Sequence, residues 1–131
     1  MTLLVCIDDR NGLMFNKRRQ SRDAAVIADA LAHVAPEKIG VSAYSATLFP
    51  EGAVTVYDDP LAEADICFAE CGDFLSAIHK VQRLIVYRWN RLYPGDAYFP
   101  LEDYLIRMTL VESSDFSGNS HERITREVYE L

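Results

Sequence analysis

A cluster of basic residues precedes the first segment of the chain that has helical periodicity. It consists of Lys17, Arg18, Arg19 and Arg22 and is the densest group of cations in the sequence. A helix N-terminus favours anions, and the arginine guanidinium group binds phosphate and carboxylate groups through two parallel hydrogen bonds. The cluster is therefore a candidate clamp for an anionic ligand. The alternative is a solvated loop that balances an acidic surface.

Asp23 follows this cluster at the start of the expected helix. A carboxylate in that position can hydrogen-bond the amidine edge of a heterocycle held between a sheet and a loop. It can equally do no more than satisfy the backbone N–H groups of the helix N-terminus. The sequence leaves both interpretations open.

A second group of polar side chains ends an apolar run, Leu84 to Trp89. Side chains alternate along a strand, so Tyr87 and Trp89 are expected on one face and Arg88 on the other. Arg88 or Arg91, at the end of this strand, is a candidate second contact for an anion bound by the basic cluster, and for Arg88 pairing with an acid is the alternative. The two aromatic rings are equally suited to a plain hydrophobic core.

Cysteine and histidine residues indicate neither a disulfide framework nor a metal centre. The chain has three cysteines, an odd number without the spacing of a secreted scaffold, so we expect free thiols. Cys71 lies near a helix start, where the dipole can activate a thiol, but a buried inert cysteine is the preferred interpretation. The histidines, which lack metal-ligand spacing, are His33, His79 and His121.

The elements that position these residues alternate between strands and helices. Expected strands are Leu3 to Ile7, Ile39 to Val41, Val54 to Tyr57, Ile66 to Ala69, Leu84 to Trp89, Tyr104 to Glu112 and Arg123 to Leu131. Expected helices are Ser21 to about Ala35, a turn or two in Tyr44 to Phe49, and a helix opened by Gly72. Asp8 to Gln20 is expected to be a loop, and Asp115 to Ser120 a turn between two antiparallel strands. This order predicts one α/β domain, residues 1–131, with a mixed, mostly parallel sheet flanked by helices.

Charge and composition restrict the classes of partner. The chain of 131 residues has a net charge of -7 and a pI near 4.8, which argues against nucleic-acid and anionic-membrane binding. The apolar N-terminus stops at Asp8 and lacks a basic leader, so we interpret it as a strand and expect a cytoplasmic protein. A small molecule is the expected partner, and a homodimer is left open.

Two parts of the chain resemble the dihydrofolate reductase family. The C-terminal part joins the strand Leu84 to Trp89, the pair Gly95-Asp96, the pair Phe99-Pro100 and a closing hairpin over Leu110 to Leu131. The N-terminal part joins Leu3 to Asp9, the turn Asn11-Gly12 and the helix that contains Asp23. The resemblance covers well over half of the chain and implies the fold of that family.

The resemblance also implies roles for single residues. Asp23 is similar in position to the family's acidic residue, which assists protonation of the pterin ring. Tyr87 is similar to the hydroxyl residue that partners this acid, so the two side chains are expected to meet in the pocket and form the catalytic pair.

The chain departs from the family's pattern where NADPH is bound. A Leu-Pro-Trp run is replaced by Asn16 to Gln20, and a glycine-rich segment after the fourth strand is replaced by Ala69 to Asp73, where acidic side chains repel phosphates. Ser42 to Tyr44 takes the place of a phosphate-binding arginine, and the segment from Val41 to Ile66 is short. These departures imply a reduced cofactor half and no cofactor bound in the family's manner.

The leading hypothesis is therefore a protein that keeps the pterin-side cleft for a small anionic or heterocyclic ligand. The candidate ligand-binding residues are Arg18, Arg19, Gln20, Arg22, Tyr44 and Arg88. Whether a reaction occurs is left open. One alternative is a divergent NADPH-dependent oxidoreductase acting on dihydrofolate or a related pterin, and another is a non-catalytic structural or interaction protein.

Overall fold

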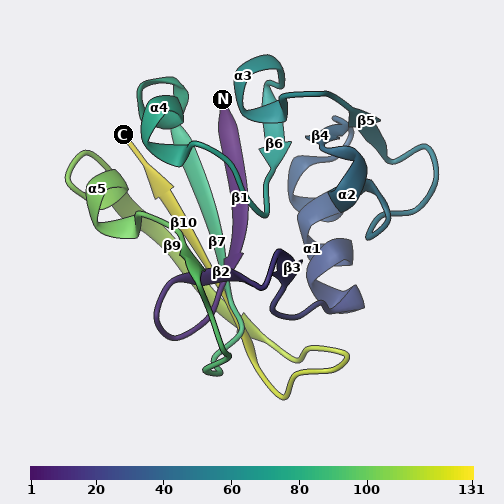
Figure 1. The fold of residues 1–131 in the computed structure, drawn as a ribbon, viewed down its shortest axis with the longest axis vertical. Helices are drawn as coiled ribbons and strands as arrows, with labels where there is room; N and C mark the ends of the chain where they lie inside the picture. Colours follow the sequence, from purple (N-terminus) through teal and green to yellow (C-terminus); the bar gives the residue numbers. More distant parts are fainter.

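Seven strands form one twisted sheet through the middle of the computed structural model, which describes all 131 residues (Figure 1). The strands of the chain are β1 (Thr2–Ile7), β2 (Gly12–Phe15), β3 (Arg18–Arg19), β4 (Ile39–Val41), β5 (Val54–Val56), β6 (Ile66–Phe68), β7 (Arg83–Arg88), β8 (Ala97–Tyr98), β9 (Thr109–Phe116) and β10 (Ile124–Glu130). The helices are α1 (Ala24–Val34), α2 (Ala43–Ala46), α3 (Pro60–Glu63), α4 (Phe74–Ala77), the 3-10 helix η1 (Ile78–Lys80) and α5 (Leu101–Leu105).

The sheet is mostly parallel and has β1 at its centre. Its strand order is β5-β4-β6-β1-β7-β10-β9. β1 pairs in parallel with β6 and with β7, where Leu3 lies opposite Leu84, whereas β10 runs antiparallel to both β7 and β9. The predicted mixed sheet with an antiparallel C-terminal pair is therefore confirmed.

Alternating side chains on the central strands bury both faces of the sheet. Leu3, Val5 and Ile7 pack on one face with residues of α4 and α5. Leu4 packs on the other face with α1, and Tyr87 and Trp89 belong to this second cluster, as alternation predicts. In Figure 1 the central strands lie between α1 and the pair α4 and α5. The helix α1, which begins directly after Asp23, therefore covers the Leu4 face of the sheet.

The segment from Asp8 to Gln20 is not a plain loop, and that prediction was wrong. β2 and β3 form a hairpin within it, and β8 adds a third strand. The hairpin turns at Asn16 and Lys17, which have φ of 51° and 62°. Both are in the left-handed region that a two-residue hairpin turn requires, and asparagine enters this region more readily than most residues.

Three other element boundaries differ from the expectation. Tyr104 belongs to α5, and its buried hydroxyl donates to the carbonyl oxygen of Phe74 at 2.7 Å, so the strand there begins only at Thr109. The residue that caps α1 is Asp23, not Ser21, and α4 is capped by Asp73 one residue after Gly72. A polar side chain that accepts from the helix N-terminus determined both starts. A further short helix, α3, was not predicted at all.

Candidate functional site

The buried carboxylate of Asp23 joins the start of α1 to the loop between β9 and β10. On its own helix it accepts a hydrogen bond from the backbone N–H of Ala25 at 2.8 Å. From the loop it accepts three more, from the backbone N–H groups of Asn119 and Ser120, both at 2.8 Å, and of His121 at 3.1 Å. The geometry matches the helix-capping interpretation, because the carboxylate faces protein donors.

These donors determine the charge of Asp23. Burial opposes its ionisation, but the hydrogen bonds from Asn119, the His121 side chain, Ser120 and Ala25 outweigh burial and hold the pKa of Asp23 well below its ordinary value. A carboxyl group with so low a pKa is ionised at neutral pH. Asp23 therefore has no proton of its own to give to a heterocycle.

His121 extends this arrangement to two hydroxyl groups. Its Nδ1 lies 2.9 Å from the Oδ2 of Asp23, and its Nε2 lies 3.0 Å from the Oγ of Ser21 and 2.9 Å from the hydroxyl oxygen of Tyr93. The imidazole ring stacks on Trp89 with centroids 4.6 Å apart. Sequence reasoning treated His121 only as a residue without metal-ligand spacing. Since it lies 98 positions from Asp23, no local pattern could have revealed their contact.

Tyr87 does not meet Asp23, contrary to what the resemblance implied. Its hydroxyl donates to the Oδ2 of Asp29 at 2.6 Å, and the other oxygen of Asp29 accepts from Arg126 at 2.7 Å. Burial, together with this bond to Asp29, raises the pKa of Tyr87 far above its ordinary value. The hydroxyl is thus a permanent donor within a polar cluster between α1 and β10.

Arg19 and Glu70 form an ion pair that connects β3 to the end of β6. Arg19 donates through Nε at 2.7 Å and through Nη2 at 3.0 Å to the two carboxylate oxygens of Glu70, which also accepts from the Oγ of Ser45 at 2.7 Å. The guanidinium carbon lies 4.2 Å from the ring centroid of Tyr44. Two predicted ligand-binding residues, Arg19 and Tyr44, are therefore engaged with the protein itself. We call Arg19, Tyr44, Ser45 and Glu70 the Arg19 clasp.

Replacing Glu70 with glutamine is expected to lower the free energy of unfolding by about 1–2 kcal/mol, because a two-bond ion pair becomes a weaker neutral contact. The pair is mostly shielded, with 19% and 9% of the two side chains exposed. Urea unfolding of Glu70→Gln, Arg19→Met and the double variant measures the coupling. Strictly additive effects of the two changes would contradict the clasp.

Two more predicted ligand contacts also have protein partners. The side-chain amide of Gln20 donates to the Oδ2 of Asp8 and to the carbonyl oxygen of Pro94, each at 3.0 Å. Arg88 donates to Glu127 at 2.6 Å, which is the alternative that the sequence left open for it. The amide N–H groups of Gln20 are therefore used within the protein, but its Oε1 is buried without a hydrogen-bond partner.

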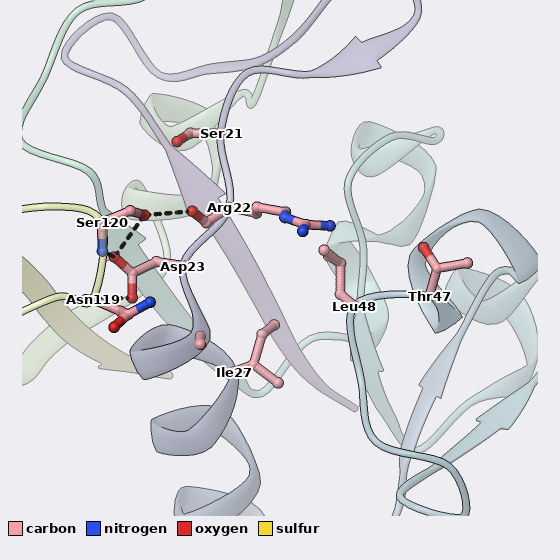
Figure 2. A pocket seen from close by; sticks show the side chains of 9 residues that line it. Ser21, Arg22, Asp23, Ile27, Thr47, Leu48, Asn119 and Ser120 are labelled. Atoms are coloured by element: carbon pink, nitrogen blue, oxygen red, sulfur yellow. Dashed lines mark hydrogen bonds between the residues drawn. The ribbon is translucent and has the colours of Figure 1, made fainter.

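A cavity of about 640 Å³ lies between the start of α1, the segment Thr47–Leu48 and the loop residues Asn119–Ser120. Figure 2 shows the Arg22 side chain extending toward Leu48 and away from Asp23. Arg22 forms no ion pair within the protein. Its free guanidinium makes this cavity a candidate ligand site, which we call the Arg22 cavity.

A second, enclosed space of about 20 Å³ lies deeper, bordered by Cys6, Phe68 and Trp89, and it shares Asp23 with the Arg22 cavity. This volume has room for about one water molecule. A ring system therefore fits only in the outer cavity.

Arg18 is exposed and belongs to a different cavity, of about 410 Å³, beside Phe15 and Pro94. Arg19 and Gln20 line this same cavity, whereas Arg22 lines the Arg22 cavity. The basic cluster is therefore divided between two cavities.

The cysteines are free, and burial raises the pKa of Cys67 to about 12. Cys71 is exposed, so the prediction of a buried thiol there was wrong. No group of three or more histidine, cysteine and acidic side chains is placed to hold a metal ion. None of the helices has both the length and the apolar character needed to cross a membrane.

Comparison with known proteins identifies the fold. Neither a protein-family model nor a curated protein sequence matches the chain. In three dimensions the chain is similar to a dihydrofolate reductase from Enterococcus faecalis that was solved in complex with NADP(H) and RAB-propyl. The TM-score is 0.72, the match covers 98% of this chain and 94% of that one, and 12% of the residues are identical. Likeness at this identity establishes a dihydrofolate reductase-like fold and nothing further.

Proposed function

We propose that the protein binds a small anionic or heterocyclic ligand in the Arg22 cavity and does not bind NADPH in the manner of dihydrofolate reductase. The observation that carries this proposal is the unpaired guanidinium of Arg22, which lines the 640 Å³ cavity. Arginine is the side chain best suited to recognise a carboxylate or phosphate, because its planar fork matches their geometry. A pocket of this size is typical of sites for small organic molecules.

The lining of the Arg22 cavity supports a ligand with one apolar and one charged end. Ile27 and Leu48 offer apolar surface, while Asn119 and Thr47 offer polar groups. The narrow space behind Asp23 excludes a ring from the interior, and the carboxylate itself is fully used by the loop. The ligand therefore lies across the mouth of the former pterin-side cleft, with its charge at Arg22.

The Arg19 clasp supports the proposal that NADPH is not held as in the reductases. Glu70 places a carboxylate directly after β6, in the segment where the resemblance implies a glycine-rich approach for the diphosphate. A second carboxylate, Asp73, is exposed nearby at the start of α4. Because Arg19 is occupied by Glu70, it is not free to bind a phosphate here, and the carboxylate of Asp73 disfavours one.

A thermal-shift comparison tests the proposal. NADPH, dihydrofolate, methotrexate and inorganic phosphate are each added at fixed protein concentration, and a ligand at 100 times its Kd stabilises by about 2.7 kcal/mol. We expect the wild-type protein to be stabilised by a folate or by phosphate. In Arg22→Ala the apparent affinity for that ligand should be roughly 10- to 100-fold weaker. In Arg91→Ala, the control at another exposed arginine, the affinity should not change. Equal shifts in both variants would contradict binding at Arg22.

The divergent-reductase alternative is favoured by the similarity to a reductase structure that contains NADP(H). It predicts a shift with NADPH and oxidation of NADPH on addition of dihydrofolate. A non-catalytic interaction protein predicts no shift with any of these ligands, but a particle larger than one chain in size-exclusion chromatography.

A further inference from the structure

Ser21, His121 and Asp23 form a continuous hydrogen-bonded chain at one end of the Arg22 cavity. The Oγ of Ser21 lies 3.0 Å from the Nε2 of His121, and the Nδ1 of the same ring lies 2.9 Å from the Oδ2 of Asp23. A hydroxyl, an imidazole and a buried carboxylate in this order are the parts of an activated serine nucleophile. Ser21 lines the cavity and is the member of this chain that a bound molecule can approach, since the His121 and Asp23 side chains are 3% and 0% exposed.

The surroundings of His121 determine which ring nitrogen faces Ser21. Asp23 is an anion that can only accept, and therefore the proton of a neutral imidazole is held on Nδ1. This leaves the lone pair of Nε2 toward the Ser21 hydroxyl. The stacked Trp89 holds the ring in place, and only 3% of the His121 side chain is exposed. The base is thus oriented before any substrate arrives.

Tyr93 is a further participant at this end of the cavity. Its hydroxyl oxygen is 2.9 Å from Nε2 of His121 and 3.3 Å from the Oγ of Ser21. Nε2 has one lone pair, so the two hydroxyls compete for it. Removal of the Tyr93 hydroxyl leaves Ser21 as the single hydroxyl bonded to the base. A Tyr93→Phe change should therefore raise the reactivity of Ser21.

Arg22 carries two hydrogen-bond donors that no protein group uses. Its backbone N–H, directly after the nucleophile, donates to no protein acceptor, and its guanidinium has no ion pair. An unpaired N–H next to the nucleophile is the usual donor to the oxyanion in acyl transfer. The guanidinium favours an acyl group with a negative charge, a choice of substrate that rests on the proposed function.

We propose that Ser21 is a nucleophile that hydrolyses small carboxylic esters, with His121 as its general base and Asp23 as the carboxylate that orients His121. The Oγ of Ser21 attacks the ester carbonyl while its proton passes to Nε2. The alcohol then leaves with that proton, and an acyl ester remains on Ser21. Water attacks this ester, gives a proton to Nε2, and releases the acid as the proton returns to Ser21. The net reaction is ester and water to acid and alcohol.

Covalent labelling tests this proposal without any assumption about the natural substrate. The folded protein is treated with an alkyl fluorophosphonate, whose phosphorus forms a bond to an activated serine with loss of fluoride, and the labelled peptide is identified by mass spectrometry. We expect a single label, at Ser21, which is lost in Ser21→Ala. The label should be kept in Ser113→Ala, the control, because Ser113 is an exposed serine on β9. In Tyr93→Phe the rate of labelling at Ser21 should rise. No label at Ser21, or a label distributed over several serines, would overturn the proposal.

Ser21→Cys gives a second measurement that is independent of the stability of His121 variants. A thiol beside an oriented imidazole forms a thiolate well below the usual pKa of about 8.5, so its alkylation by iodoacetamide should persist down to about pH 6. Exposed Cys71 in the same molecule is the internal control. If the introduced thiol reacts with the same pH profile as Cys71, His121 does not act as a base. The variant Arg22→Ala separates this proposal from the binding function. If Arg22→Ala loses the thermal shift on addition of ligand but Ser21 is still labelled, the binding site and the nucleophile are independent.

Discussion

Replacing Asp23 with alanine is expected to lower the free energy of unfolding by about 3–5 kcal/mol. The side chain is 0% exposed and accepts from three backbone N–H groups of the loop and one of its own helix. Alanine leaves four N–H groups without their acceptor, of which that of His121 is buried and the other three are part-buried. Urea unfolding measures the loss, and Asp58→Asn, at an exposed carboxylate, is the control.

The pH dependence of stability gives a second measurement on the same residue. The folded-state pKa of Asp23 lies below its value of about 3.9 in the unfolded chain, so the stabilisation is complete above that value and declines as pH falls below it. In Asp23→Asn the decrease in the free energy of unfolding that comes from protonation of Asp23 is absent. If wild type and Asp23→Asn lose stability in parallel below about pH 4, the charge of Asp23 is not what holds the loop.

Replacing Gly118 with alanine is expected to cost about 2–3 kcal/mol, because the site has no room for a methyl group. A Cβ there would lie 2.6 Å from the Oδ2 of Asp23 and 2.6 Å from the carbonyl oxygen of His121. Neither atom can withdraw, since the carboxylate is held by the loop and the carbonyl is backbone. The loop must shift and release Asp23.

A control at Gly52 distinguishes the cost of a steric clash from the cost of an unfavourable backbone conformation. Gly52 has φ of +83°, and a Cβ added there would meet nothing within 4 Å, so Gly52→Ala should cost only about 1 kcal/mol of strain. Urea unfolding compares the two variants. Since Gly118→Ala acts through Asp23, its effect should be much smaller in an Asp23→Ala background, and full additivity would show that the two residues act independently.

Much of the fold could be predicted because its central strands are continuous runs of apolar residues in the sequence. Leu3 to Ile7 and Leu84 to Trp89 are buried on both faces, and this leaves a pattern that a single sequence displays. The β2–β3 hairpin was missed because its turn uses Asn16-Lys17, and lysine is not a residue that signals left-handed φ. Tyr104 was misassigned because one buried aromatic fits a strand and a short helix equally well.

The candidate site was predictable in its location but not in its connections. The sequence identified the segment from Arg18 to Asp23, and its last residues, Ser21 to Asp23, do line the Arg22 cavity. It could not show that Glu70 lies beside Arg19 or that His121 lies beside Asp23, since these pairs are 51 and 98 positions apart. Such pairs depend on how the strands are ordered in the sheet. The resemblance to a family gave Asp23 a partner, Tyr87, that in this chain bonds Asp29.

The central position of β1 affects when the molecule can fold during its synthesis. β1 is made first, yet its neighbour β7 begins at Arg83, and β10, which completes that side of the sheet, begins at Ile124. The donors to Asp23 arrive nearly as late, at residues 119–121. An emerging chain therefore carries an apolar strand whose partners, β6 and β7, are complete only once Arg88 has been made. Contacts of such long sequence separation make folding slow, and an apolar strand that waits for its partners is exposed to aggregation.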